Sequence, residues 1–484
     1  MAKSIRKNSI MMVLYELLSL FVPLILTPYI SRAVGANGIG IYSFTYSIVT
    51  YFVISIQLGV KLYGRREIAK VNDDRQNYSA VFWEIMTIQT VMFIFVTVAY
   101  VFFLFIYDCS ALIKTALIIQ YIEILVGYLD ISWLYYGLED FKVILYRNIV
   151  VRAFEMVFIL TFVHNVDDII MYVLIMAACN FLGVMFMWPT LRKIISIVRV
   201  SWISVRRRIF PMLQLFIPVL SSVLFAMVDK TIIGINLDIE SVGYYENAYK
   251  VAKIPVVIIT ALGSVMLPRI TKLLADGKKD ESEKYISKSM SIVMFISCGI
   301  SFGICAVSQT FIPVFLGSGF EESIPLLELL SFMIIFIGWG NVLRTQYMLP
   351  KGFDKAYTKS VLYASVLNIL LSFYLVKSLG TIGVASASLF GEIVICLYTN
   401  HILKEELPIK EYVLKSTRYI IIGLIMLILV KRISLILDTL NPITLLFIEI
   451  IIGGGLYCFL TLLYEYLTKD YIIAEELNII LRKK

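Results

Sequence analysis

Long apolar runs follow one another along the whole chain, separated by short polar stretches. Most of the runs have about 20 residues, which is the length an α-helix needs to cross the hydrocarbon core of a bilayer. Apolar residues are continuous within each run, whereas the strands of a transmembrane barrel would show alternation. The pattern therefore predicts an all-α polytopic membrane protein.

Charged residues, Gly and Pro mark the ends of the runs, which predict about fourteen transmembrane helices. The first run is longer than a signal-peptide core and lacks a small-residue cleavage site, so we expect it to be retained. The predicted spans lie near residues 11–34, 40–60, 81–107, 113–137, 144–164, 168–190, 211–236, 247–268, 286–308, 324–348, 356–377, 381–403, 415–437 and 442–467.

Lys and Arg are concentrated in alternate connections between these spans. The even-numbered connections are rich in basic residues, whereas the odd-numbered connections carry few and several are acidic, such as Asp167-Asp168 and Glu321-Glu322. Because positive loops stay in the cytoplasm, this bias predicts that both termini are cytoplasmic. The net charge of +8 then reflects membrane orientation, and it gives no reason to expect a nucleic acid partner.

A stretch near the start of the chain is repeated about half a chain later. Leu20-Phe21-Val22-Pro23 and the spacing Gly40-x-Tyr42-x-x-x-Tyr46 recur as Leu215-Phe216-Ile217-Pro218 and Gly243-x-Tyr245-x-x-x-Tyr249. Two six-helix lobes arranged as parallel repeats are therefore predicted. The expected divisions are an N-terminal lobe over 1–190, a basic cytoplasmic linker over 191–210, a C-terminal lobe over 211–403, and two further helices with a basic tail over 404–484.

The sequence of the predicted linker has two possible interpretations. Apolar residues alternate with Arg in the linker, which is typical either of a helix lying along the membrane surface or of an ordinary basic loop.

The six cysteines are scattered without a CxxC or Cys/His cluster, so neither a metal site nor a disulfide framework is expected, and no cofactor is predicted.

Several cations lie inside or beside apolar runs, where each costs roughly 2.5–3.5 kcal/mol on insertion scales. The duplicated segments hold more bases than acids, so a cavity lined by them would suit an anion such as phosphate. Lys250, Lys253 and Arg32 have an alternative role, because their side chains can extend to the membrane interface. The candidate substrate-binding residues are Arg32, Lys230, Lys250, Lys253, Arg152 and Arg344.

Acidic residues in the same regions are candidates either for coupling an ion or for structural ion pairs: Asp229, Glu123, Asp130 and Glu155. Arg152 and Glu155 are three residues apart on one helix and can neutralise each other. Glu123 and Asp130 share a helix face and can pair with Arg147 or Arg152. Pro23, Pro28 and Pro218 are candidate hinges, with static kinks as the alternative.

Three motifs together resemble a known family. They are the opening segment Leu20–Phe44, the signature Trp133-Leu-Tyr-Tyr-Gly137-Leu-Glu139-Asp-Phe141, and the pattern from Gln346 to Gly352 followed by Asn368 and Gly380-Thr-Ile-Gly383-Val-Ala385-Ser-Ala387. In order and spacing they are similar to the polysaccharide repeat-unit flippases of the multidrug/oligosaccharidyl-lipid/polysaccharide exporter superfamily. This resemblance covers essentially the whole chain.

The resemblance implies two six-helix bundles forming a V around a central cavity, with two additional C-terminal helices. It also implies a transporter of the bacterial plasma membrane that moves undecaprenyl-diphosphate-linked oligosaccharide outward by alternating access, for capsule, O-antigen or related glycans. Membrane lipids, a polysaccharide polymerase and assembly proteins would be its partners. The resemblance also implies that Arg32 is the cationic residue found at the end of the family's first helix.

Two rival functions stay open from the residues alone. A multidrug/cation antiporter of the same superfamily would present carboxylates to its substrate, whereas the repeated spans offer mainly Asp229 against several bases. A membrane-bound glycan polymerase, ligase or acyltransferase would need a large outer loop or an intramembrane His, and neither is predicted. An enzyme is therefore not expected. A coupling ion, Na+ or H+, is left open.

Overall fold

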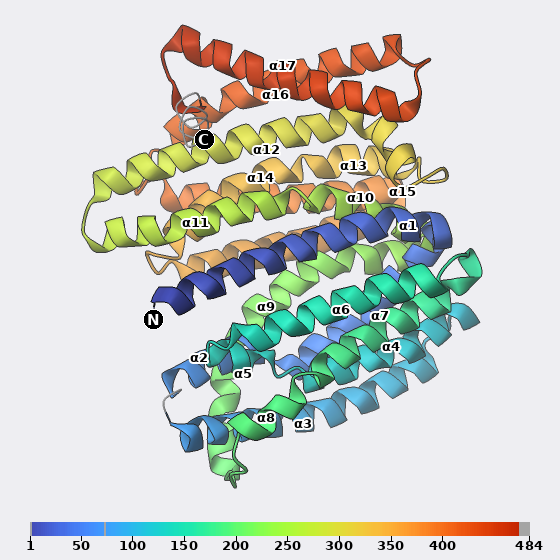
Figure 1. Cartoon of the computed structure of the whole chain (residues 1–484), viewed down its shortest axis with the longest axis vertical. Coiled ribbons are helices and arrows are strands. Elements are labelled where there is room, and N and C mark those ends of the chain that lie inside the picture. The colour runs from blue at the N-terminus through green and yellow to red at the C-terminus, as the bar shows by residue number, and fades with distance from the viewer. Residues whose placement is uncertain (1, 72–73, 474–484) are drawn as a thin grey trace. The chain divides into compact units, whose positions relative to one another are not determined.

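The computed structural model describes residues 2–71 and 74–473, and within them the secondary structure is helical, without strands (Figure 1). Among these residues, eleven helical segments are long and apolar enough to cross a membrane. The predicted all-α polytopic membrane fold is confirmed. The count of about fourteen spans stays a prediction, because two of the eleven segments contain a break and α6 (Phe141–Phe162) is a further apolar helix outside the eleven.

The chain divides into two compact units, residues 1–243 and 244–484. The boundary between the lobes at 190–211 is inferred from the sequence repeat, and it stays a prediction. Unit 1 contains α1 (Ala2–Gln57), α2 (Val60–Lys70), α3 (Arg75–Ile106), α4 (Ala111–Leu129), α5 (Ser132–Gly137), α6, the 3-10 turn η1 (Val166–Asp168), α7 (Ile169–Met185), α8 (Trp188–Ile194) and α9 (Trp202–Asn236).

The helix α10 (Ile239–Lys253) begins in unit 1 and continues into unit 2. Unit 2 then contains α11 (Val256–Ala275), α12 (Lys279–Phe315), α13 (Ser323–Ser331), α14 (Met333–Asn341), the π-helix η2 (Val342–Met348), α15 (Asp354–Leu403), α16 (Ile409–Ile436) and α17 (Pro442–Thr468).

Two glycines break long helices where the sequence predicts a boundary between spans. Gly35 in α1 has φ 68° and Gly380 in α15 has φ 58°, both in the left-handed region. Glycine adopts this conformation at little cost because it has no Cβ. Each helix can therefore reverse direction across the membrane without a polar loop.

Unit 1 packs around α4, which contacts α1, α3 and α7. The signature segment beginning at Trp133 forms α5 and packs on α2. Trp133 is buried and stacks on Phe82, with ring centroids 5.6 Å apart. A Cβ on Gly64 would collide with the Trp133 ring, which explains the small residue at that position. The signature is therefore a packing motif in this unit.

Unit 2 packs around α12, which lies beside α16 and α17 in Figure 1 and contacts both helices. The Tyr457 hydroxyl of α17 donates to the Phe295 carbonyl of α12 at 2.9 Å. A Cβ on Gly299 would lie 2.7 Å from the Tyr457 ring, so the glycine is needed for this close approach. The two C-terminal helices thus share a core with the rest of the unit.

The duplicated Gly-x-Tyr-x-x-x-Tyr motif has similar local geometry in both copies. Tyr42 and Tyr46 stack with centroids 5.6 Å apart and an angle of 17° between their planes. Tyr245 and Tyr249 stack at 6.0 Å, also at 17°. The sequence repeat is therefore accompanied by a structural repeat on one helix of each copy.

Several predicted boundaries differ from the structure. The fourth predicted span, 113–137, is interrupted because α4 ends at Leu129 and the Asp130 carboxylate accepts a bond from the Ser132 amide at 3.0 Å. The predicted basic linker is not one surface helix, since α8 ends at Ile194 and α9 begins at Trp202. Helix α9 then continues through Pro218 and α1 continues through Pro28. The side chain of Pro23 lies outside the described residues. A hinge role for these prolines stays a prediction.

Candidate functional site

The predicted cationic site residues fall into two groups, one in each unit. Arg32, Arg152 and Lys230 belong to unit 1, whereas Lys250, Lys253 and Arg344 belong to unit 2. The helices that carry them are apolar for most of their length. The charge environment of each group is therefore set out within its own unit.

Two of the three candidate cations of unit 2, Lys253 and Arg344, share a neighbourhood with one buried carboxylate. Lys253 at the end of α10 interacts electrostatically with Glu392 of α15 and with Arg344 of η2. Glu392 is only 6% exposed. Two cations and one carboxylate leave a net positive charge, so this group, which we call the Glu392 cluster, is suited to an additional anion.

Aromatic rings support both cations of the Glu392 cluster. The Lys253 Nζ lies 5.2 Å from the centroid of the Tyr249 ring, in the second copy of the tyrosine motif. The Arg344 guanidinium lies 5.5 Å from the centroid of Tyr357. Ring faces attract cations without neutralising them. The positive charge thus remains available to a ligand.

A π-helical turn carries Arg344 and leaves polar groups unmatched. The Arg344 Nε donates to the Gly340 carbonyl at 3.2 Å. Gln346 is fully buried, and neither its amide nitrogen nor its amide oxygen has a hydrogen-bond partner among the described residues. Because buried polar groups are normally paired and π-turns are common at functional sites, Gln346 is an additional candidate. Its amide within an apolar run was the sequence signal for it.

Lys250 is held by its own helix. Its Nζ lies 3.2 Å from Glu246, which is one turn away and buried. This pair neutralises Lys250 locally, so the structure offers less support for a substrate role here than at Lys253. That role stays a prediction.

In unit 1, a polar pocket of about 150 Å³ lies between α4, α6 and α7. It contains two guanidinium groups, each paired with an acid: Arg152 lies 2.5 Å from Glu155, and Arg147 lies 3.6 Å from Asp130. Lys61 also lies 3.3 Å from Asp130. The lining residues are Val126, Asp130, Arg147, Asn148, Val151, Arg152, Asn180, Gly183 and Val184.

Arg32 and the Asp229-Lys230 step lie apart from this pocket. Arg32 is exposed on α1, three residues before the break at Gly35. Asp229 and Lys230 are buried on α9. The next residue, Thr231, is within hydrogen-bond distance of Ser47 at 2.9 Å and Tyr51 at 3.0 Å, so this level of α9 packs directly on α1. The contact of Thr231 with α1 therefore positions the buried Asp229-Lys230 pair.

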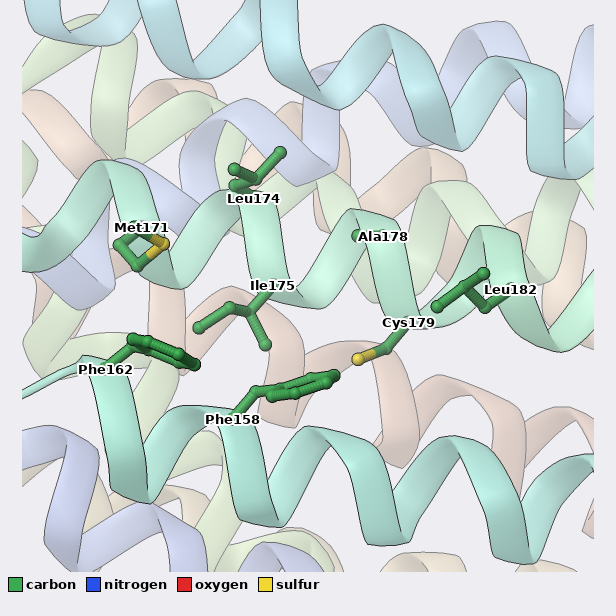
Figure 2. A pocket seen from close by; sticks show the side chains of 8 residues that line it. All are labelled: Phe158, Phe162, Met171, Leu174, Ile175, Ala178, Cys179 and Leu182. Atoms are coloured by element: carbon green, nitrogen blue, oxygen red, sulfur yellow. The ribbon is translucent and has the colours of Figure 1, made fainter.

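Figure 2 shows a second cavity of about 240 Å³ between α6 and α7, with only apolar or sulfur-containing side chains around it. Phe158 and Phe162 line one side, and Met171, Ile175 and Cys179 are among those on the other. A diphosphate would find no hydrogen-bond donor there. We therefore do not place the anion site in this cavity.

No group of three or more His, Cys, Asp or Glu able to hold a metal ion occurs among the described residues. The cysteines are all free thiols.

Comparisons with known proteins identify a family and several relatives. The family described as polysaccharide biosynthesis protein matches residues 5–274. A putative O-antigen transporter of Escherichia coli is 24% identical over 408 residues, covering 83% of this chain and 96% of the relative. A probable low-salt glycan biosynthesis flippase, Agl15 of Haloferax volcanii, is 26% identical over 247 residues, about half of each chain.

Solved structures of two transporter types share the fold. The lipid II flippase MurJ in an inward closed conformation superposes with a TM-score of 0.75 at 18% identity, covering 96% of this chain and 99% of that one. An inward-facing multidrug MATE transporter superposes with a TM-score of 0.59 at 13% identity, covering 81% and 98%. Since the family match spans more than half of the chain, this protein belongs to the polysaccharide biosynthesis family; the two relatives are named as a transporter and a flippase, not as enzymes, and the chain shares its fold with the MurJ and MATE transporters.

Proposed function

We propose that this protein moves undecaprenyl-diphosphate-linked oligosaccharide from the cytoplasmic to the outer leaflet of a bacterial plasma membrane, for the assembly of capsule, O-antigen or a related glycan. The observation that carries the proposal is the Glu392 cluster, where Lys253 and Arg344 outnumber the carboxylate. A diphosphate needs cationic partners, and charge-assisted hydrogen bonds are the strongest that proteins offer it.

Three further points support the lipid-linked substrate. The names of the two curated relatives connect them with O-antigen and with glycan flipping. Apolar side chains cover much of the outer surface of the transmembrane helices, so a prenyl tail can remain in lipid while the head passes along the protein. An inside-negative potential favours outward movement of an anion by about 2.3 kcal/mol per charge per 100 mV.

Alternating access, both termini in the cytoplasm, and contact with a polymerase and assembly proteins belong to the same proposal. Under it, Arg32 and Lys230 of unit 1 provide additional cationic contacts. Their burial differs, since Arg32 is exposed whereas Lys230 is buried. Since Arg32 is at the outer end of the first predicted span, we expect it to act late, when the head group reaches the outer leaflet.

Transport in vesicles tests the proposal. The purified chain would be reconstituted with lipid-linked oligosaccharide, and exposure of the sugar to an external lectin would be followed over time. Lys253→Ala and Arg344→Ala should each slow transport by about 10- to 100-fold, because each removes a charge-assisted bond of roughly 1.5–3 kcal/mol. Lys377→Ala, an exposed lysine of the same unit, is the matched control. Wild-type rates in both cationic variants would show the anion-binding role to be wrong.

A further inference from the structure

One buried carboxylate of unit 1 has no cationic partner among the residues that the structure describes. Glu123 of α4 is 7% exposed, and its Oε1 accepts a hydrogen bond from the Asn180 amide nitrogen of α7 at 2.8 Å. Among the described residues, no Lys, Arg or His nitrogen lies within ion-pair distance of Glu123. An ionised carboxylate in such a place is costly, whereas its neutral acid is readily accommodated.

A neighbouring like charge makes ionisation of Glu123 less favourable still. Glu123 interacts electrostatically with Glu155 of α6, a like charge. Glu155 is 1% exposed and is held by Arg152, which contacts its Oε2, while its Oε1 has no hydrogen-bond partner among the described residues. Arg152 is thus engaged with Glu155, and Glu123 is stabilised by a neutral amide.

The polar pocket of unit 1 is lined by a partner of each carboxylate. Asn180, the partner of Glu123, lines the pocket, as does Arg152, the partner of Glu155. Asp130 and Arg147 line it as well. A volume of about 150 Å³ is enough for several water molecules, each occupying roughly 30 Å³. The pocket lies at the end of α4 that the loop charges predict to be cytoplasmic.

We propose that Glu123 is a proton-binding site of the N-terminal half, loaded from the cytoplasm through the Asn180–Arg152 pocket. Water in the pocket delivers a proton, an O–H bond forms at Glu123 Oε2, and Asn180 continues to donate to Oε1. Reversal of this step returns the proton to water. The inference rests on the proposed transport function, for which it supplies a coupling ion.

The other groups around Glu123 do not provide a competing counter-charge. Helix α3 faces this level of α4 with residues 91–96, an apolar stretch between its contacts Thr90–Tyr128 and Thr97–Tyr121. Helix α1 and helix α7 contribute neutral phenols and a thiol. The titratable groups near the two carboxylates are Tyr42, Tyr46, Tyr172 and Cys179. The charged groups that line the pocket are Asp130, Arg147 and Arg152, and each arginine is paired with an acid other than Glu123.

Infrared difference spectroscopy of the full chain in lipid bilayers tests the site without any glycan. A pH titration should show the carbonyl band of a protonated carboxyl group, and Glu123→Gln should remove that band. Glu84→Gln is the matched control, since Glu84 is equally buried at 7% but is ion-paired with Arg208, and it should leave the band unchanged. Asn180→Ala should keep the band and shift its frequency, because one hydrogen bond to the acid is lost. That variant also carries the test if Glu123→Gln does not fold.

Three results would overturn the assignment. One is a band that is the same in Glu123→Gln and the wild type, and another is a band unaltered by Asn180→Ala. The third is loss of the band on adding Na+ at constant pH, which would identify a metal cation as the occupant. Transport in vesicles gives a separate outcome. If the band is present but lipid-linked oligosaccharide does not move, the proposed function fails while the proton site stands.

Discussion

At the residue scale, several charges on the apolar helices of unit 1 are neutralised by a specific neighbour. Arg152 pairs with Glu155, three residues away, and Arg147 with Asp130 across the helices. The first pairing follows from helix periodicity alone. The second needs two helices to meet at one level, so sequence reasoning could name Arg147 and Arg152 as alternative partners of Asp130 without choosing between them.

Arg208 provides the first prediction at this scale. Its guanidinium contacts Glu84 of α3, the Glu67 carboxylate at 3.3 Å and the Tyr63 hydroxyl at 3.2 Å. Arg208→Ala would leave Glu84 buried without a counter-ion, so we expect a loss of about 1–3 kcal/mol in the free energy of unfolding. Denaturation in detergent measures this loss. Adding Glu84→Gln should recover part of it, and an additive double variant would contradict the pairing.

Glu406 provides a pH-dependent prediction outside the membrane-spanning segments. Hydrogen bonds from the Lys351 ammonium at 2.5 Å and the Tyr347 hydroxyl at 2.8 Å hold the pKa of this carboxyl below its usual range. A lowered pKa in the folded state contributes stability that is present above the unfolded pKa of about 4.3 and is lost as the pH falls through the folded value.

Glu406→Gln should therefore destabilise the protein at pH 7 by about 0.2–1 kcal/mol, the range of partly exposed ion pairs. The difference from the wild type should vanish in acid, where both side chains are neutral. Thermal unfolding at pH 7 and at pH 3 measures it. Glu405→Gln, the neighbouring residue, is the control, and a difference that persists in acid would contradict the mechanism.

At the scale of elements, two glycines allow backbone to approach backbone. A Cβ on Gly40 of α1 would collide with the Ile239 carbonyl, and a Cβ on Gly243 of α10 would collide with the Ala36 carbonyl. These are the glycines of the two copies of the repeat, and both contacts lie inside unit 1. The repeat thus has a packing reason, which its sequence spacing does not reveal.

Gly243→Val should lower the free energy of unfolding by about 1–3 kcal/mol. The added side chain would collide with the Ala36 carbonyl, and a backbone carbonyl cannot move aside as a side chain can. Gly454→Ala on α17 is the control, since a Cβ there has no heavy atom within 4 Å. Thermal unfolding of the two purified variants provides the measurement. Equal stability of both would show that the close contact of Gly243 does not form.

Pro28 and Pro218 do not coincide with a break in the helix that contains them. Pro28 and Pro218 are both inside helices, yet the non-helical backbone of α1 is at Gly35 and α9 is assigned as one helix. A proline removes one hydrogen bond, whereas a residue with positive φ reverses the chain. The breaks therefore follow the glycines.

At the scale of the whole molecule, the loop charges predict the orientation of the chain in the membrane. If both termini are cytoplasmic, a fluorescent protein fused after Lys484 should fluoresce, and alkaline phosphatase inserted after Asp168 should be active. Phosphatase inserted after Lys142, in a connection predicted to be cytoplasmic, should be inactive and serves as the control. The reverse pattern would invert the proposed direction of transport.

The sequence by itself determined the fold class, the family and the approximate limits of the helices. Apolar run length, loop charge and the order of three motifs are local properties, so no knowledge of packing was required. The family resemblance read from Trp133–Phe141 and the opening segment is confirmed by the match over residues 5–274.

Only the tertiary structure decided which charges share a neighbourhood. Lys253 and Arg344 are on different elements from Glu392, yet both share the neighbourhood of this buried carboxylate. The amide of Gln346, which has no hydrogen-bond partner among the described residues, lies on a π-helical turn. Glu123 likewise differs from Glu84 by its partner and not by its burial. The free energy of a buried charge depends on neighbours distant in the chain, and one sequence does not specify them.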